Sequence, residues 1–389
     1  MRIDKAIKTS RTLQFGFKAR ELKQQGKDII SLGLGEPEFD TPTHIKKAAS
    51  EALDAGMTRY SSAPGLPELR ELIAQQLHDN NGIAADSEEI IVTPGAKNAL
   101  FVACASTLEP GDEVINFTPC YVSNIPILKL AEPKVVIHNV PLTGDEFAID
   151  QEKIESLINE KTKLIMINYP NNPTGLSISA EQANFIHHIV RDNDLYLLSD
   201  EIYERIMFGG KRHISLASFD DIREKVITVN GFSKAYSMTG WRIGYVHANS
   251  DLVSVMLKVH QHLNTNTPAF IQQAAVAAIK GPQDHIGEFI KNLEERKVLY
   301  EEMLSANDYL SGSRPQGGFF AFLNISRTGF TSDEFCTKLI ENTGVVCIPG
   351  ISFGEDFDHY CRVSLVNYTP IVAEGLQRIS SFVDQIGRA

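Results

Sequence analysis

Between residues 90 and 247, short runs rich in β-formers, most of them continuously apolar, alternate with segments of helical pattern. Strands exposed on one face alternate apolar and polar residues, whereas strands covered on both faces are apolar throughout. Strand–helix alternation of this kind predicts an α/β domain, with a mostly parallel seven-stranded sheet sandwiched by helices. The seven expected strands are Ile90–Val92, Val114–Phe117, Val135–Val140, Leu164–Tyr169, Leu195–Leu198, Val226–Val229 and Arg242–His247.

The pattern changes after about residue 284, where a long amphipathic helix begins at Ile286 and continues to Leu304. Strands are expected at Phe319–Ile325, Val345–Ile348 and Cys361–Val366, with helices at Thr331–Asn342 and after Thr369. This order indicates a smaller α+β domain. We therefore expect a large domain over residues 46–284, and a small domain built from residues 285–389 and the N-terminal arm, residues 1–45.

The charge balance excludes some classes of partner. Lysine and arginine total 37 against 49 acidic residues, so the formal charge is −12. An acidic surface repels nucleic acid and anionic lipid, so we expect neither nucleic acid nor a membrane as partner.

The cysteine and histidine content bears on compartment and metals. Five cysteines, none in Cys-x-x-Cys spacing, fit reduced thiols in a cytoplasmic protein better than a disulfide framework. The eleven histidines contain no His-Glu-x-x-His, and the local pairs His187-His188 and His260-Gln-His262 have no nearby third ligand, so no metal is expected.

Reactive side chains follow the ends of four predicted strands. In open α/β sheets, ligands bind beyond the carboxyl ends of the strands. Taken singly, a turn, a helix cap or a solvated lysine would explain each of these side chains. Together they fall at the one sheet edge where α/β enzymes build their sites. The four segments are Gly95-Ala96-Lys97, Asn171-Asn172-Pro173, Asp200–Tyr203 and Ser233-Lys234.

These residues resemble a known family. The segment Ser233-Lys234-Ala-Tyr-Ser-Met-Thr-Gly-Trp-Arg242 looks like the lysine motif of class I/II aminotransferases, which are fold-type I pyridoxal-phosphate enzymes. Asn-Asn172-Pro-Thr-Gly175 and Asp200-Glu-Ile-Tyr203 are similar to the family's next most diagnostic motifs, in the same order and spacing. The resemblance runs from about Ser10 to the last helix. Within the family it is greatest to the bacterial aspartate aminotransferase branch.

The resemblance implies how the coenzyme ring is held. Lys234 would form the Schiff base with pyridoxal 5'-phosphate and carry a proton during the reaction. Asp200 would pair with the pyridinium nitrogen, which keeps the ring an electron sink. Tyr203 and Asn172 would hydrogen-bond the phenolic oxygen, and Tyr121 would stack on the ring.

It also implies a phosphate site at Gly95, Ala96 and Lys97, with Arg242 as a forked donor. The chain departs from many relatives at Gly231, where a phosphate-binding serine is frequent, and Ser233 is a weaker candidate. Tyr60 matches a tyrosine that reaches the neighbouring subunit's phosphate, so a homodimer with shared active sites is expected.

The same resemblance implies the substrate contacts. Arg362 would bind the α-carboxylate as a bidentate pair, near Gly35 and Asn172. Lys97, Ser10 and Thr12 match the positions that help to hold a distal carboxylate in the aspartate branch.

The expected activity is therefore the ping-pong exchange of an amino group between an L-amino acid and a 2-oxo acid, with aspartate and 2-oxoglutarate as leading pair. Aromatic, alanine-like or specialised amino acids remain alternatives, as does a β-lyase on the same scaffold. A third alternative is a pyridoxal-phosphate-binding regulator. Those regulators carry a DNA-binding domain in front, for which we expect no room before Gly33.

Overall fold

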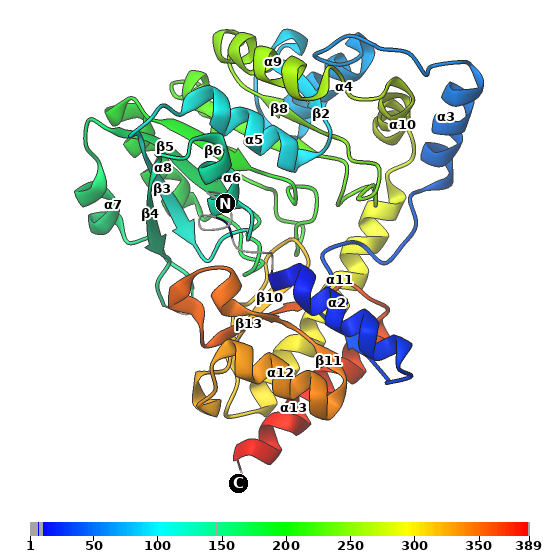
Figure 1. Ribbon diagram of the computed structural model, residues 1–389, viewed down its shortest axis with the longest axis vertical. Coiled ribbons are helices and arrows are strands. Elements are labelled where there is room, and N and C mark those ends of the chain that lie inside the picture. The colour runs from blue at the N-terminus through cyan, green and yellow to red at the C-terminus, as the bar shows by residue number, and fades with distance from the viewer. Residues whose placement is uncertain (1–6, 8–10, 145, 388–389) are drawn as a thin grey trace.

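The computed structural model describes residue 7, residues 11–144 and residues 146–387. A large twisted sheet with helices on both sides forms one body, and a smaller group of strands and helices lies against its lower edge (Figure 1).

The large sheet has seven strands in the order β2-β8-β7-β6-β5-β3-β4. Only β8 runs antiparallel to its neighbours, and the four pairs from β7 to β4 are parallel. The predicted mostly parallel seven-stranded sheet is thus confirmed. The strands are β2 Ile90–Thr93, β3 Glu113–Thr118, β4 Val136–Pro141, β5 Thr162–Asn168, β6 Tyr196–Asp200, β7 Val226–Gly231 and β8 Gly244–His247.

The continuous apolar runs arise because helices cover both faces of this sheet. Within β5, Ile165 and Ile167 belong to one hydrophobic cluster, whereas Leu164 and Met166 belong to another, as the alternation of side chains along a strand requires. The first cluster includes helices α3 Thr43–Asp54, α4 Pro67–Asn81, α7 Gln151–Leu157, α8 Ala180–Asn193 and α10 Ala269–Lys280. The second includes α5 Ala96–Thr107, α6 Asn124–Ala131 and α9 Ser250–Asn264.

Two helices begin at the capping boxes that the sequence indicates. The Ser179 side chain accepts from the backbone of Gln182 at the start of α8, and Thr331 and Glu334 form the same reciprocal pair at the start of α12.

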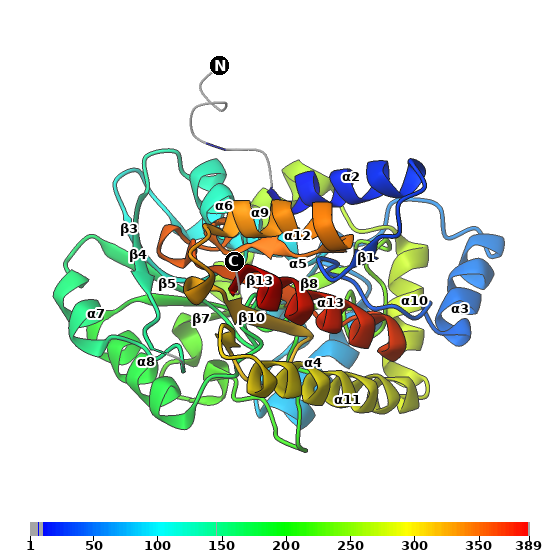
Figure 2. The ribbon, with the colours of Figure 1, turned by 90° about the horizontal axis from the view of Figure 1, so that it is seen from below.

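The C-terminal elements build a second core. Figures 1 and 2 both place these helices beside the small sheet. An antiparallel sheet has the order β12-β13-β10-β9, and a separate parallel pair joins β1 and β11. The strands are β1 Ile30–Ser31, β9 Ser311–Gly312, β10 Phe320–Asn324, β11 Val345–Val346, β12 Ile348–Pro349 and β13 Tyr360–Ser364. The helices are α11 Asp284–Ala306, α12 Ser332–Thr343 and α13 Thr369–Gly387.

One expectation is wrong here: residues 345–348 do not form a single strand. Val345 and Val346 pair in parallel with β1, whereas Ile348 pairs antiparallel with Arg362 in β13. Cys347 lies between the two short strands, which pair with different partners, β1 and β13.

The N-terminal arm joins the C-terminal core. Helix α2, Arg11–Gln24, buries Ala19 against Ile340 and Val346, and Arg11 forms an ion pair with Asp333. These contacts agree with the grouping of the arm into the small domain, whose boundaries stay a prediction. Among the described residues, no helix is long and apolar enough to cross a membrane.

Candidate active site

The predicted site residues meet where the carboxyl ends of β5, β6 and β7 face β13 and the segment 33–41. Lys234 lies just after β7, and its Nζ donates to the carbonyl oxygen of Gly35 at 2.5 Å. The amine lies over the rings of Tyr203 and Phe319, 5.8 and 5.6 Å from their centroids. Burial, with the nearby positive charge of Arg362, lowers the pKa of Lys234 to about 8. A nucleophilic neutral amine is therefore accessible near neutral pH.

Asp200 is a buried carboxylate at the end of β6. It is 5% exposed, and its Oδ1 accepts a hydrogen bond from the backbone N–H of Ile202 at 3.2 Å. Burial raises its pKa to about 7, and the negative charge of Glu201 adds to the shift. A cationic N–H donor, such as a protonated pyridine nitrogen, would stabilise the ionised form of this buried carboxyl group.

Tyr203 and Asn172 line the same space. Tyr203 is buried against Phe319 in an edge-to-face contact at 5.2 Å, and burial raises the pKa of its hydroxyl. The side chain of Asn172 accepts from Arg362, and its backbone N–H donates to the side chain of Asn168 at 2.9 Å. The Tyr203 ring thus lies beside the lysine amine, and the Asn172 side chain lies beside Arg362.

Arg362 is a buried cation with neutral partners. It is 3% exposed, donates from Nη1 to Asn172 and from Nη2 to the carbonyl of Gly33, both at 3.0 Å, and its Nε has no partner. Its guanidinium stacks 4.0 Å from the ring centroid of Phe320. Burial lowers its pKa to about 10. Since no carboxylate of the described residues bonds to it, this fork is a ready receptor for a substrate carboxylate.

An anion cradle lies at the start of α5. Gly95 precedes the helix with φ 86°, no side chain caps the helix, and a Cβ at Gly95 would lie 2.6 Å from Nη2 of Arg242. Free N–H groups at a helix N-terminus and a guanidinium together favour a phosphate. Ser233, the residue before Lys234, is buried.

The structure explains the departure at Gly231. A Cβ there would lie 2.8 Å from the Cα of Gly244, its partner on β8. No side chain fits between these strands, so a serine at this position would force them apart.

The remaining predicted residues are less closely grouped. Lys97 is exposed, with its Nζ 5.6 Å from the ring centroid of Tyr121. Thr12 lies on α2 with a buried Oγ1 that lacks a hydrogen-bond partner. Tyr60 is 86% exposed, and Ser10 lies outside the described residues.

Sequence reasoning missed three contributors: the carbonyl of Gly33, the Phe320 ring and Asn168. Asn168 is the last residue of β5. Its side chain donates to the backbone carbonyl of Asp200 at 2.9 Å and accepts a hydrogen bond from the backbone N–H of Asn172. Its position at a strand end could therefore have identified it from the sequence. Gly33 and Phe320 act through tertiary approach, which no local pattern encodes.

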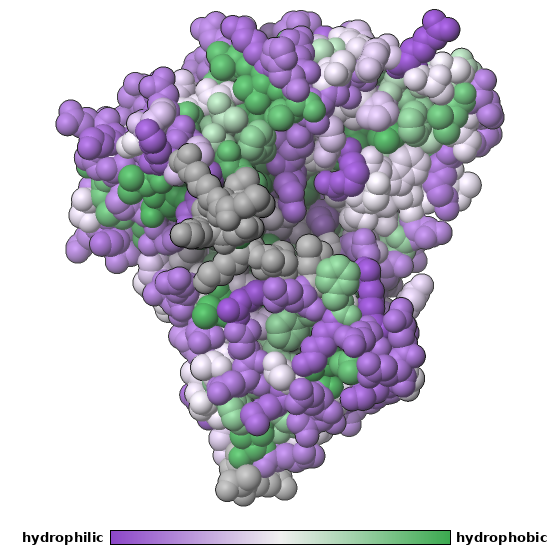
Figure 3. All heavy atoms as spheres, in the orientation of Figure 1, coloured by the Kyte–Doolittle hydropathy of each residue, from purple (hydrophilic) through white to green (hydrophobic). Residues whose placement is uncertain are grey.

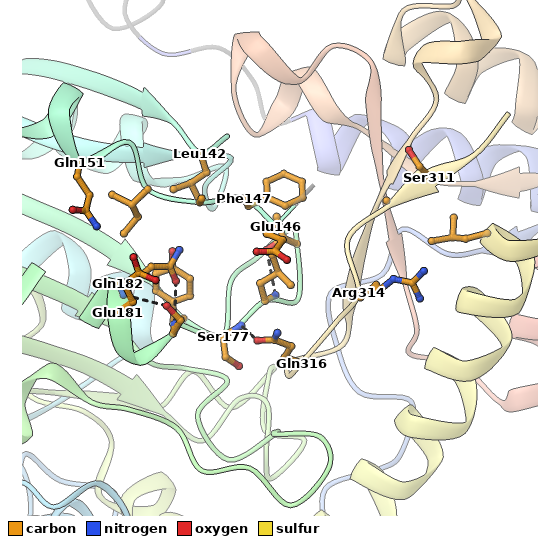
Figure 4. A pocket seen from close by; sticks show the side chains of 18 of the residues that line it. Leu142, Glu146, Phe147, Gln151, Ser177, Glu181, Gln182, Ser311, Arg314 and Gln316 are labelled. Carbon is orange, nitrogen blue, oxygen red and sulfur yellow. Dashed lines mark hydrogen bonds between the residues drawn. The ribbon is translucent and has the colours of Figure 1, made fainter. Parts of the chain in front are cut away.

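Neither of two sizeable cavities is lined by Lys234. A cavity of about 650 Å³ lies between residues 146–151, 174–182 and 304–316, with Glu146 and Arg314 among its lining residues (Figure 4). A second, of about 520 Å³, follows residues 36–41 and Ser237 to Trp241, next to the Gly35 contact. The site is therefore identified by its converging charges rather than by volume.

A lysine of lowered pKa, a buried carboxylate and a phosphate cradle at a helix N-terminus fit pyridoxal phosphate. With a buried arginine that bonds only neutral groups, this arrangement on a doubly covered α/β sheet is typical of the pyridoxal-phosphate-dependent aminotransferases.

The comparisons agree. The family model "Aminotransferase class I and II" matches residues 27–376, and the chain belongs to this family. It is 36% identical over 387 residues to the aspartate aminotransferase of Bacillus subtilis, covering 98% of each protein. It is 38% identical to that of Pyrococcus horikoshii, covering 94% of each.

Solved structures extend the agreement to the fold. The Thermus thermophilus aspartate aminotransferase with maleate has a TM-score of 0.91 and 34% identity, covering 98% of each chain. An aromatic aminotransferase from Pyrococcus horikoshii has a TM-score of 0.89 and 36% identity, covering 95% of this chain and 100% of that one. The protein is thus a pyridoxal-phosphate-dependent transaminase.

Proposed function

We propose that the enzyme exchanges an amino group between L-aspartate and 2-oxoglutarate in a ping-pong cycle. The observation that carries the proposal is Arg362, a buried guanidinium with neutral partners and an unpaired Nε beside Asn172. Such a group requires an anion to compensate its burial, and the α-carboxylate of an amino acid meets that need. Gly35 would add a backbone contact close to the same carboxylate.

Lys234 and Asp200 would divide the proton chemistry. When bound, pyridoxal phosphate supplies the electron sink for the pair of electrons left at the substrate Cα. Lys234 would hold the coenzyme in the resting enzyme, and afterwards carry the Cα proton as a neutral base. Asp200 would keep the pyridine nitrogen protonated. The Tyr203 hydroxyl would donate a hydrogen bond to the phenolic oxygen of the coenzyme.

The coenzyme phosphate would lie on the backbone N–H groups of Gly95, Ala96 and Lys97. Arg242 would complete the cradle, with Ser233 as an additional hydroxyl. Tyr121 would stack on the pyridine ring. The support is the uncapped start of α5 and the approach of Arg242 to Gly95.

Lys97 would contact the distal carboxylate of aspartate, with Ser10 and Thr12 as neutral donors. A charged hydrogen bond of this kind contributes roughly 1.5–3 kcal/mol, or about ten- to a hundredfold in kcat/KM. Lys97→Ala should lower kcat/KM by that factor for aspartate and leave it nearly unchanged for alanine and phenylalanine. The control is Lys134→Ala, which removes an exposed lysine that has no proposed role in the site. Equal losses for all three substrates would contradict the assignment.

Two other activities fit the same scaffold. A preference for aromatic amino acids is suggested by the likeness to the aromatic aminotransferase of Pyrococcus horikoshii. A β-lyase would use the same lysine to expel a β-substituent. Single-turnover spectra with a panel of amino acids separate them: loss of the pyridoxal spectrum with release of a 2-oxo acid means transfer, and release of ammonia with pyruvate means elimination.

The active unit would be a cytoplasmic homodimer with shared sites. Tyr60 is 86% exposed. Other large apolar side chains are also exposed to solvent, among them Phe17 at 63% and Leu263 at 50%. Apolar patches interrupt the hydrophilic surface on the face in Figure 3. Burial of these side chains by a second copy would bring Tyr60 to that copy's phosphate site. The five free, buried cysteines fit a reducing compartment.

A further inference from the structure

A buried polar cluster lies directly behind Asp200, centred on the next residue, Glu201. The Glu201 side chain is fully buried, and its Oε1 accepts from the hydroxyls of Ser199 at 2.9 Å and Ser215 at 2.8 Å. Nε2 of His213, also buried, lies 3.1 Å from Oε2. None of these four residues belongs to the proposed coenzyme or substrate contacts.

The cluster is on the side of β6 away from the cradle at α5. Leu198 packs in the cluster of α5 and α9, whereas Leu197 packs in the other, and the alternation of side chains places Ser199 with Leu197. Glu201 is also fixed through its backbone, since its N–H donates to the carbonyl of Val229 in β7 at 2.8 Å. Asp200 is therefore held between two anchored residues, Ser199 and Glu201.

A fully buried carboxylate needs compensation, because its isolated burial costs several kcal/mol. His213 supplies it. Burial alone lowers the pKa of an imidazole, but the nearby carboxylates of Glu201 and Glu204 outweigh this, and the pKa of His213 is raised. Glu201 and His213 are thus a close, buried carboxylate–imidazole pair in which the carboxylate favours the protonated imidazole, and the pair lies next to the residue that would face the coenzyme.

We propose that Glu201 and His213 are a positioning pair for Asp200. Glu201 locks the end of β6, from which the Asp200 carboxylate extends, and the paired charges set the electrostatic field at the coenzyme. This inference rests on the proposed role of Asp200.

Other charged and titratable groups surround the pair and contribute to the same field. Asp200, Glu204 and Tyr245 act on the pair directly, whereas Arg205 lies near Glu204 and Lys234 near Asp200. Because single substitutions leave these groups in place, differences between variants report on the pair.

The test compares Glu201→Gln with His213→Gln by titrating the absorbance of enzyme-bound pyridoxal phosphate against pH. Loss of the negative charge should lower the apparent pKa of the absorbance change, and loss of the positive charge should raise it. Each shift should be roughly 0.3–1 unit, the scale of one charge at about 10 Å in a protein. Glu181→Gln, an exposed carboxylate on α8, should shift it by less than either.

A merely structural pair would destabilise the protein in both variants, with shifts that are absent or of the same sign, and this result overturns the proposal. Thermal unfolding of the apoprotein is measured in parallel. If Glu201→Gln does not fold, His213→Gln decides alone: an upward shift supports the pair, and no shift or a downward shift refutes it. If the wild-type enzyme shows no Lys234-dependent pyridoxal absorbance, the proposed active site fails instead, so the two failures are distinct.

Discussion

Two buried groups of the site have pKa values that nearly meet. Lys234 is lowered to about 8 and Asp200 is raised to about 7, both chiefly by burial. Near pH 7.5 the amine can release its proton without a large cost in free energy, and the carboxyl group can take up a charge when a cation arrives. This near-match prepares the lysine for attack and the aspartate for the pyridine nitrogen.

Lys234→Ala should abolish turnover, because it removes the amine that would form the Schiff base and carry the Cα proton. The variant should still fold and bind pyridoxal phosphate without a covalent bond, since the cradle at Gly95 and the Asp200 carboxylate remain. Absorbance spectra and activity with aspartate check this. Lys134→Ala, exposed on the surface, is the control. Near-normal transamination by Lys234→Ala would overturn the site.

Asp200→Asn should lower kcat by at least ~10²-fold, the scale of losing one positioned electrostatic partner. The amide cannot stabilise a protonated pyridine, so the ring becomes a weaker electron sink. Steady-state kinetics with saturating coenzyme measure the effect. Full activity in this variant would mean that another group protonates the ring.

The same substitution has a pH signature in the apoprotein. The unfolded carboxyl has a pKa of about 3.9, against about 7 when folded, so from pH 4 to 7 the unfolded chain binds fewer protons. The free energy of unfolding contributed by Asp200 is therefore fully present below pH 4 and is lost as the pH rises to 7. Above pH 7 it no longer changes. Relative to Asp200→Asn, wild-type apoprotein should lose up to about 4 kcal/mol over this range. Denaturant unfolding at several pH values checks this, and parallel curves would contradict it.

At the scale of elements, β8 approaches the start of α5 so closely that only glycine fits. A Cβ on Gly244 would lie 2.6 Å from the backbone nitrogen of Ala96. Gly244→Ala should push the helix N-terminus away, weaken coenzyme phosphate binding, and cost roughly 1–3 kcal/mol of stability. Coenzyme dissociation and thermal unfolding measure both effects. Gly240→Ala, with nothing within 4 Å, is the matched control and should behave as wild type.

The elements of the large sheet could be predicted because each carries its own local signal. Doubly covered strands are apolar throughout, and the capping boxes at Ser179 and Thr331 mark helix starts. The division at Cys347 could not be predicted, because it depends on the partners β1 and β13. The strand-end side chains of the site could likewise be named from sequence, whereas the carbonyl of Gly33 reaches Arg362 only through tertiary approach.

At the scale of the whole molecule, site sharing predicts complementation. Lys234→Ala carries an intact Tyr60, and Tyr60→Phe carries an intact Lys234. In a mixed dimer, one site would receive Lys234 from one subunit and Tyr60 from the other, and would regain wild-type coenzyme affinity. Sedimentation of the holoenzyme and coenzyme titration of the mixed dimer check this. A fully active monomer, or a mixture no better than its parents, would leave Tyr60 as a residue of its own subunit.

The pairing of β1 with β11 joins the two ends of the chain, and Arg362 reaches back 329 residues to the carbonyl of Gly33. During synthesis, therefore, the large sheet can form well before its site is complete. Ile30 and Ser31 can pair with β11 only after residue 346 has left the ribosome. Contacts so distant in sequence close slowly. The catalytic centre is consequently completed late, and a chain arrested before Arg362 would lack the guanidinium that is proposed to bind the substrate carboxylate.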